Sequence, residues 1–370
     1  MEEKLVTIVV LPYSKAQILK MRLEAKNIEC DLEDINLIEG TTSFSVKVKI
    51  MEKDIQQAVP MIEDLLGKKP DLVIEKAKEK KERHILVPID FSLSSKKTCK
   101  IAFNIASLLN VKLVFMHCYI NPLVHSIPFS DVYAYDSSLL IKMEYAEKNA
   151  NENFQQFMTK LAQEIGTEKW NSVKSEFIIK SGYADEDILA YALKNNSSLI
   201  VMGSGKEASE PTIVGSVTVD AIYNSPVPVL VIPENTPDQE LSQFSRILYA
   251  TNFDEKDFAV VDKLMSLLKP FDMKLICVHV GQPKQNGWDL ARLEGMKDIL
   301  HEKYKNKEFE CKLIVGNDIL NALEAFIKEE KIDIISLTTH KRNMISQLFN
   351  PSLAKKMVFH TTTPLLVFHA

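Results

Sequence analysis

Short apolar runs separated by amphipathic segments recur through residues 84–234. Such near-continuous runs are typical of strands buried on both faces of a parallel sheet, and the segments between them have helical spacing. Strands that alternate with helices in this way predict an α/β fold with a doubly wound parallel sheet. With a strand order of 3-2-1-4-5, the ligand crevice lies at the carboxyl ends of the first and fourth strands. The predicted strands are residues 85–89, 112–117, 173–179, 199–202 and 227–232.

The remainder of the chain repeats this pattern. Residues 84–91, which read HILVPIDF, match residues 246–253, which read RILYATNF, at an offset of 162. His117 and His279 share the same offset. A constant offset over two separate strands indicates an internal duplication rather than a chance similarity.

A second offset fixes the lengths of the two halves. Residues 228–231 (PVLV) match residues 364–367 (PLLV) at an offset of 136, so the second half is shorter by 26 residues. The missing length corresponds to a part of the first half that holds a long helix, predicted near residues 138–165. We therefore expect two five-stranded domains, at residues 84–234 and 246–370.

The last strand of each half is an apolar run that would otherwise stand as an unprotected sheet edge. These strands are residues 227–232 and 365–368. We expect them to pair with one another, so that the two halves form an internal pseudo-dimer. A further homodimer of the whole chain is left open by the sequence.

The first 66 residues follow a different order, strand–helix–strand–strand–helix, which predicts a small α+β domain with one polar sheet face. It resembles small signal-transducing bacterial domains with a ferredoxin-like fold. Glu33 and Asp34 are interpreted as part of a solvated hairpin face rather than as a catalytic pair. Residues 67–83 are rich in Lys and Glu and predict a linker, flexible or helical from Leu72 onward. The elements expected before it are strands 5–11, 29–36 and 43–51, with a turn around Gly40, and helices 14–26 and 55–66.

Composition narrows the class of protein. The net charge of −5 gives no indication of a nucleic-acid surface, and no apolar run is long enough for a membrane span. Five cysteines stand far apart without a C-x-x-C pair, which argues against a disulfide framework or a zinc site and suits a reducing cytoplasm. We therefore expect a cytoplasmic protein with no nucleic-acid or membrane partner.

A glycine-rich loop follows the fourth strand of the first half. Gly203 and Gly205 end the apolar run, and Gly215 with Ser216 begins an amphipathic segment. Glycine lets backbone N–H groups approach a ligand closely, and a helix N-terminus favours an anion. The stretch therefore predicts a phosphate-binding loop. It is not a Walker A loop, because Glu207 follows Lys206 where a Ser or Thr is required and no glycine stands at position 200.

The motifs together resemble the universal stress protein family. Its members carry a first strand that ends in Asp, as in ILVPIDFS here, a G-x2-G-x9-G-[ST] signature and a final P-V-L-V strand. This chain has Asp90, the three glycines with nine residues before Gly215-Ser216, and VPVLVIP from Val227. It has one residue between the first two glycines where the family has two. The resemblance implies an adenine nucleotide α-hydrolase-like fold and a site for ATP or a related adenine nucleotide.

The resemblance also implies which residues of the first half contact the nucleotide. The adenine and ribose are met by Pro88, Ile89, Asp90 and Cys118. The ribose and phosphates are met by Met202, Gly203 and Gly205. The phosphate tail is held by Gly215, Ser216, Val217 and Thr218.

Structural alternatives remain for several of these residues. Asp90 has the position of a helix N-cap, for which Ser92 is a rival. Cys118 alone is typical of a buried small side chain. His117 and His279 are interpreted as hydrogen-bonded structural residues, since no residues with metal-ligand spacing surround them.

The second half has lost the signature. Asn252 stands in place of Asp90, and the three glycines are replaced by Thr338, Lys341 and Pro351. Proline at a helix entry removes an N–H donor that a phosphate would need. We therefore interpret this half as structural or as a surface for a protein partner, with any nucleotide bound only in the first half.

Three functions remain open at this point. The first is a non-enzymatic stress-response and signalling protein that binds an adenine nucleotide. The second is an enzyme, either a slow ATPase or an adenylating enzyme, although residues 91–94 lack the H-x-G-H type motif of adenylating relatives and no catalytic set is evident. The third is a scaffold or partner-binding module that binds no nucleotide.

Overall fold

The computed structural model divides into two compact units, Met1–Lys81 and Glu82–Ala370, and each is considered by itself. Within them, no helix of the described residues is long and apolar enough to cross a membrane. The described residues are 5–34, 45–66, 75–76, 82–120, 137–205, 215–237, 245–253, 255–267, 269–281, 286–305, 307–316, 318–339 and 362–369.

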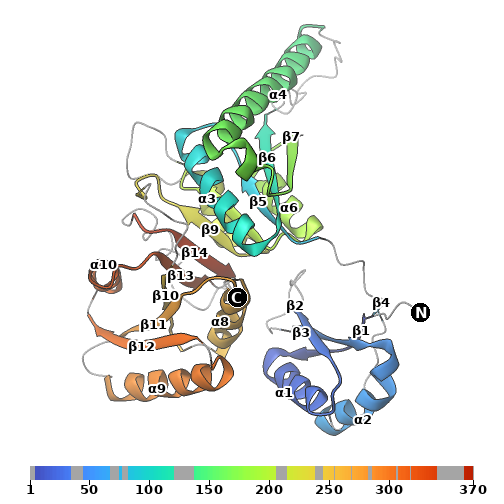
Figure 1. Cartoon of the computed structure of the whole chain (residues 1–370), viewed down its shortest axis with the longest axis vertical. Helices are drawn as coiled ribbons and strands as arrows, with labels where there is room; N and C mark the ends of the chain where they lie inside the picture. The colour runs from blue at the N-terminus through green and yellow to red at the C-terminus, as the bar shows by residue number, and fades with distance from the viewer. Residues whose placement is uncertain are drawn as a thin grey trace, which may run out of the picture. The chain divides into compact units, whose positions relative to one another are not determined.

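The first unit is a four-stranded antiparallel sheet in the order β2-β3-β1-β4, and α1 and α2 lie side by side against it (Figure 1). Along β3, Val46, Val48 and Ile50 are buried while Lys47 and Lys49 are half-buried, which is the expected alternation of a sheet with one face on the core. The elements are β1 (Leu5–Pro12), α1 (Tyr13–Glu24), β2 (Cys30–Asp34), β3 (Ser45–Met51), a 3-10 turn (Glu52–Asp54), α2 (Ile55–Leu66) and β4 (Glu75–Lys76).

Strand β4 corrects one expectation. Glu75 and Lys76 lie in the stretch predicted to be a flexible or helical linker, but they pair antiparallel with Thr7 and Val6 of β1. Such a short edge strand of two charged residues has no apolar period, so the sequence pattern does not mark it. The rest of the predicted linker up to Lys81, and the predicted turn around Gly40, lie outside the described residues.

The second unit is built on parallel strands and has the predicted alternation of strands and helices. The first half contains β5 (His84–Pro88), α3 (Leu93–Leu109), β6 (Lys112–Tyr119), α4 (Ser137–Ile165), α5 (Thr167–Trp170), β7 (Ser175–Ser181), α6 (Ala184–Asn195), β8 (Leu199–Gly203), α7 (Ser216–Asn224) and β9 (Val229–Ile232). The second half contains β10 (Arg246–Ala250), α8 (Glu255–Leu267), β11 (Lys274–Gly281), α9 (Asn286–Lys303), β12 (Glu308–Val315), α10 (Ile319–Glu329), β13 (Ile334–Thr339) and β14 (Leu365–His369).

All the described strands of this unit belong to one ten-stranded sheet rather than to two separate sheets. Its order is β12-β11-β10-β13-β14-β9-β8-β5-β6-β7. Within each half the order is the expected 3-2-1-4-5, with parallel pairing throughout. The order therefore reverses beside β5, which is the switch point at which ligands of such sheets bind.

The two halves meet through β9 and β14, which pair antiparallel at the centre of the sheet (Figure 1). Leu230 is the direct partner of Leu366, and these two residues are equivalent at the repeat offset of 136. A residue that pairs with its own equivalent lies on a two-fold axis. The pairing of the two edge strands is thus confirmed, with the register of a symmetric dimer interface.

The core also crosses this junction. One apolar layer covers each face of the sheet, and each layer contains side chains from both halves. Alternate residues of β9 face opposite layers: Leu230 packs in one, and Val229 and Val231 pack in the other. The two halves therefore bury their apolar side chains in a common core rather than in two separate cores.

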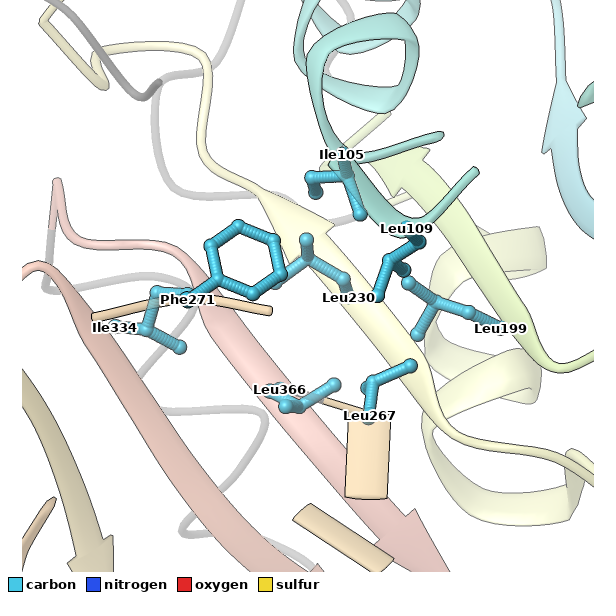
Figure 2. Close-up of a pocket in the computed structure, with 8 residues that line it drawn as sticks. All are labelled: Ile105, Leu109, Leu199, Leu230, Leu267, Phe271, Ile334 and Leu366. Carbon is cyan, nitrogen blue, oxygen red and sulfur yellow. The ribbon is translucent and has the colours of Figure 1, made fainter. Parts of the chain in front are cut away.

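A small apolar cavity of about 20 Å³ lies beside the axis (Figure 2). Its lining consists of four pairs of residues that are equivalent between the halves, so the cavity follows the internal symmetry. The pairs are Ile105 with Leu267, Leu109 with Phe271, Leu199 with Ile334, and Leu230 with Leu366.

Candidate functional site

Asp90 follows β5 at the switch point; the residue keeps solvent access, but its carboxyl is partly enclosed by the start of α3. Its Oδ1 accepts hydrogen bonds from the backbone N–H of Ser92, at 3.0 Å, and from the hydroxyl of Ser95. Burial raises the pKa of the Asp90 carboxyl, but the hydrogen bonds donated by Ser92 and Ser95 lower it, and the net shift is downward. The carboxyl is therefore ionised at neutral pH and is a strong acceptor.

The capping role at this turn belongs to Ser92. Its side chain accepts a hydrogen bond from the backbone N–H of Ser95, at 3.0 Å, at the start of α3. This is the normal geometry of a helix N-cap. Asp90 thus does not cap α3, which removes the simplest structural reason for a carboxylate at this position.

A histidine on the neighbouring strand holds the turn after β5. The Nδ1 of His117 donates to the carbonyl of Ile89 at 2.7 Å, and its ring lies 4.2 Å from the ring of Phe91. Phe91 has a φ of 65°, a conformation that costs energy for a bulky residue and needs such support. Burial lowers the pKa of His117, and its hydrogen bond to Ile89 opposes this only in part.

The second half repeats this arrangement. The Nδ1 of His279 donates to the carbonyl of Thr251 at 2.9 Å, and Phe253, with a φ of 65°, lies 4.3 Å from its ring. The arrangement persists in the half that has lost Asp90, which favours a role in the fold for both histidines. The predicted hydrogen bonding of both histidines is confirmed, and their structural role stays a prediction.

Two glycines let the ends of the loop after β8 close on each other. The N–H of Gly215 donates to the carbonyl of Ser204 at 2.9 Å. A methyl group on Gly215 would lie 2.7 Å from the carbonyl oxygen of Gly205, and Gly205 itself has a φ of 63°. Neither position accepts a side chain without strain, so both glycines have a structural reason beyond any ligand.

Gly203 and Thr218 complete this closure. A methyl group on Gly203 would lie 2.6 Å from the hydroxyl of Ser94 on α3. The hydroxyl of Thr218, which is buried, donates to the carbonyl of Gly203 at 2.9 Å. Thr218 thus uses its side-chain proton to fasten α7 to β8, and its backbone N–H is the group that can face a ligand.

Helix α7 begins beside this closure, and its N-terminus presents backbone N–H groups that can act as hydrogen-bond donors. Gly215 is its N-cap and supplies no side-chain hydrogen bond. The first N–H groups of a helix have no partner within the helix, and the helix dipole favours negative charge at this end. Ser216 is exposed and Val217 is half-buried, so their N–H groups lie near the surface. The N-terminus of α7 is therefore suited to an anion.

The remaining predicted residues lie at the carboxyl ends of the same strands. Pro88 ends β5, Ile89 follows it as a buried residue, Met202 is buried near the end of β8, and Cys118 is half-buried near the end of β6. Burial raises the pKa of the Cys118 thiol to about 11, so this thiol is protonated and acts as a small apolar group. Residues 206–214, which include Lys206, lie outside the described part of the chain.

We expect Gly215→Ala to lower the free energy of unfolding of the second unit by about 1–3 kcal/mol, because the added methyl group meets the Gly205 backbone. Gly295→Ala is the matched control. Gly295 lies in α9 with nothing within 4 Å of an added methyl group, so this variant gains about 0.5–1 kcal/mol from helix propensity. Urea unfolding of both variants measures the difference. Equal stability of the two variants would contradict the backbone contact.

In the second half, a buried polar cluster lies between β10, α8 and the end of β13. The hydroxyl of Tyr249 donates to Asp257 at 2.7 Å and lies 2.9 Å from the hydroxyl of Thr338. Asp257 also accepts from the hydroxyl of Thr251, at 2.6 Å, and from the N–H of Asn252, at 3.2 Å. Tyr249 and Asp257 are 0% and 2% exposed, so this polar cluster is part of the buried core.

The register of the sheet identifies the first-half equivalents of this cluster. Tyr249 and Asp257 correspond to Val87 and Ser95 at the offset of 162. Leu199 and Ile334 hold the same place against β5 and β10, so Thr338 corresponds to Gly203. Three small or apolar side chains of the first half are thus replaced by larger polar ones. The sequence comparison found Thr338 in place of Gly203 but not the other two replacements.

We expect Tyr249→Phe to lower the free energy of unfolding by about 2–3 kcal/mol, because it takes a hydrogen bond from a buried carboxylate. Tyr145→Phe is the control, since Tyr145 is 71% exposed and its replacement should change stability by less than about 0.5 kcal/mol. Thermal unfolding of both variants provides the comparison. Indistinguishable midpoints would mean that Asp257 does not depend on the Tyr249 hydroxyl.

The second half also contacts the far end of α7. The carbonyl of Ile222, in the last turn of α7, accepts a hydrogen bond from Nε2 of His369 at 2.9 Å and one from the hydroxyl of Thr339 at 3.5 Å. The last carbonyls of a helix lack partners within it, so these donors stabilise the end of α7. One helix thus joins the candidate site to the second half.

The strand registers show that the segment between the fourth and fifth strands is one residue shorter in the first half than in the second. The two fourth strands, β8 and β13, are equivalent at an offset of 135, whereas the two fifth strands, β9 and β14, are equivalent at an offset of 136. The first half therefore has one residue fewer than the second between these strands. This agrees with the single residue between Gly203 and Gly205.

No group of three or more His, Cys, Asp or Glu side chains among the described residues is arranged to hold a metal ion. The site is therefore built from one carboxylate, backbone N–H groups and a helix N-terminus. These groups bind hydroxyls and anions through hydrogen bonds.

Solved structures of similar proteins have the same fold. A universal stress protein from Archaeoglobus fulgidus DSM 4304 is 17% identical, with a TM-score of 0.55, over 77% of this chain and 98% of that chain. A Pseudomonas aeruginosa UCBPP-PA14 protein assigned to the same family is 14% identical, with a TM-score of 0.52, over 78% of this chain and 93% of that chain. At these identities the likeness shows the fold alone.

A third similar structure, 20% identical with a TM-score of 0.30, is a universal stress protein in complex with cAMP; it covers 41% of this chain and 98% of that chain. No curated protein matches the chain. The sequence profile described as the universal stress protein family matches residues 82–233 and residues 243–369, together about three quarters of the chain. The chain belongs to the universal stress protein family.

Proposed function

We propose that the first half binds one adenine nucleotide, ATP or a relative of it, and that the protein acts as a non-enzymatic regulator. The observation that carries this proposal is the meeting of Asp90, after β5, with the Gly203–Gly205–Gly215 closure and the N-terminus of α7, after β8. Both lie at the switch point of a doubly wound sheet. The choice of adenine rests on the family resemblance.

The residues present fit such a ligand in two respects. The first N–H groups of α7 have no partner within the helix, at the end where the helix dipole favours an anion. The hydroxyl of Ser204 is buried and has no hydrogen-bond partner among the described residues, so it is available to hydrogen-bond a ligand.

In the proposed complex, each group has a separate task. The N–H groups of Ser216, Val217 and Thr218 bind the phosphates at the start of α7. The ionised Asp90 accepts hydrogen bonds from the ribose hydroxyls, Met202 lies along the ribose, and Cys118 gives the base an apolar contact. These tasks are binding tasks.

The regulatory role is supported by the path from the site to the second half. The N-terminus of α7 faces the proposed phosphate position, and its last turn is fastened by His369 and Thr339. A ligand that moves or stiffens α7 therefore acts directly on the second half.

The first unit is proposed as a separate signal-transducing domain of the ferredoxin-like kind. Its strand order β2-β3-β1-β4, all antiparallel, and its two helices support this assignment. Its separation from the second unit at Lys81 supports an independent role. The signal that it transmits is left open.

One observation favours a second candidate, a scaffold that binds no nucleotide. The loop between β8 and β9 is one residue shorter than its equivalent in the second half, and it departs from the family signature at the proposed phosphate position. A shorter loop brings fewer N–H groups to the phosphates.

The test is chemical analysis of the purified protein, followed by calorimetry. The protein is denatured, and the supernatant is analysed for adenine nucleotides; the stripped protein is refolded and titrated with ATP. One nucleotide per chain is expected in both measurements. Two sites per chain would contradict the assignment to the first half, and no binding in either measurement would favour the scaffold.

A further inference from the structure

Two cysteines of the second half face each other across neighbouring strands. Cys277 on β11 and Cys311 on β12 are direct partners in the parallel register, and both are free thiols. Neighbouring strands lie about 4.8 Å apart. This spacing is within the range of Cα separations, roughly 4.4–6.8 Å, that a disulfide can span.

The first half shows what this position holds in the absence of thiols. Phe115 and Phe177 are direct partners on β6 and β7, and their rings stack at 6.0 Å with an angle of 14°. These phenylalanines are the equivalents of Cys277 and Cys311. The second half therefore carries a dithiol where the first half carries an aromatic pair.

The two thiols have unequal surroundings. Cys277 is fully buried, whereas Cys311 is half-buried on β12, which lies at the end of the ten-stranded sheet. The Cys277 thiol donates a hydrogen bond to the Cys311 sulfur, which lowers the pKa of Cys311 and raises that of Cys277; Lys297 on α9 lowers the pKa of Cys311 further. Cys311 is thus the more acidic of the two thiols and the one that an oxidant can reach.

The pKa values of the other three cysteines of the chain are raised rather than lowered. Burial raises the pKa of Cys30 to about 12 and that of Cys118 to about 11, and it also raises the pKa of Cys99. A protonated thiol is a poor nucleophile. Cys118 is a suitable internal control because it is half-buried, as Cys311 is, but lies without a second cysteine beside it in the strand register.

We propose that Cys277 and Cys311 form a redox modification site, which a hydroperoxide oxidises to an intramolecular disulfide. The Cys311 thiolate attacks the peroxide oxygen and becomes a sulfenic acid, while the peroxide is reduced to water or an alcohol. The Cys277 sulfur then attacks the sulfenic sulfur; the S–S bond forms and water leaves. Each cycle oxidises the two thiols by two electrons and reduces one hydroperoxide. A dithiol reverses it by exchange.

The disulfide would change one defined part of the second half. Helix α9 lies between the two cysteines in the sequence and packs on β11 and β12. Closing the ring from Cys277 to Cys311 therefore encloses α9 and fixes the terminal strand β12 to its neighbour. Because β12 is paired on one side only, it can make the small movement that S–S bond formation requires.

The test treats the reduced full-length protein with increasing hydrogen peroxide, blocks the remaining thiols, and maps the peptides without reduction. A peptide pair linked through Cys277 and Cys311 is expected, and dithiothreitol should remove it. In Cys277→Ala, Cys311 should instead be trapped as a sulfenic acid by dimedone, on the order of tenfold or more above Cys118. Cys118→Ala should leave the linked pair unchanged. No linked pair at doses that modify Cys118, or equal dimedone labelling of Cys118 and Cys311, would overturn the proposal.

A second measurement does not depend on peroxide chemistry. Phenylarsine oxide bridges two neighbouring thiols, so the reduced wild-type protein should bind one molecule per chain. Cys277→Ala and Cys311→Ala should each abolish this binding, and Cys118→Ala should not. A wild-type protein that binds none, or a Cys311→Ala variant that still binds one, would show that the two sulfurs do not act as a pair.

Discussion

Asp90→Asn should weaken ATP binding by tenfold to a hundredfold or more, whereas Asn252→Ala should leave it unchanged. The asparagine keeps an Oδ1 that accepts the Ser92 N–H, so the turn after β5 is preserved. It loses the negative charge that strengthens hydrogen bonds to the ribose. Each charge-assisted bond contributes about 1.5–3 kcal/mol, and 1.4 kcal/mol corresponds to about a factor of ten in affinity.

Calorimetry with ATP measures both variants, and circular dichroism checks that each is folded. Asn252 occupies the position equivalent to Asp90 in the half that has lost the glycine signature, which makes it a matched control. Asp90 is a sharper probe than Gly215, because a side chain at Gly215 disturbs the loop closure whether or not a ligand is bound. Equal affinity for wild type and Asp90→Asn would show that the carboxylate does not contact the nucleotide.

Leu230→Ala and Leu366→Ala should each lower the free energy of unfolding of the second unit by about 2–5 kcal/mol, and by similar amounts. Both side chains are buried, both line the cavity beside the internal axis, and each is the direct strand partner of the other (Figure 2). Truncation removes buried apolar area and enlarges a space that already exists. Because the two residues are equivalent about the axis, their surroundings, and therefore their losses, should be alike.

The double variant tests this contact. Residues in contact are not additive, so the combined loss should differ from the sum of the single losses by about 0.5 kcal/mol or more. Trp170, which stacks on Phe103 and Phe115, reports the unfolding of the first half by its fluorescence, whereas Trp288 is 79% exposed and changes little. Leu290→Ala, at a residue 48% exposed, is the control. Strictly additive losses would argue against a shared core at the axis.

The sequence predicts most of the fold of the second unit because strands buried on both faces must be apolar along their whole length. The run at residues 199–202 is a direct consequence of that requirement, and the repeat offset of 162 extends the prediction to the second half. The order of the strands and the pairing of β9 with β14 also agree with the structure. Pairing across an edge is predictable when an edge strand is apolar and has no charge to protect it.

Other features depend on contacts that no local pattern records. Strand β4 consists of Glu75 and Lys76, whose pairing with β1 is decided by tertiary structure alone. The Tyr249–Asp257 cluster brings together two elements and Thr338, far apart in sequence, and only the repeat alignment of Val87 with Tyr249 could have indicated it.

The candidate site, too, is only partly predictable from the sequence. Asp90 and the three glycines are marked by their spacing, and the sequence leads to all of them. It does not separate a glycine that faces a ligand from one that meets another backbone, as Gly205 and Gly215 do. Nor does it show that the hydroxyl of Thr218 is committed to Gly203. Such distinctions require the positions of both partners.

The pairing of Leu230 with Leu366 has a consequence for how the two halves could diverge. In a dimer of identical subunits, every substitution occurs on both sides of the axis, so a site cannot be lost from one side alone. Covalent fusion removes that constraint and makes the association independent of protein concentration. One side could then acquire Tyr249, Asp257 and a dithiol while the other kept Asp90. The chain is in effect a heterodimer whose one-to-one ratio is fixed by translation.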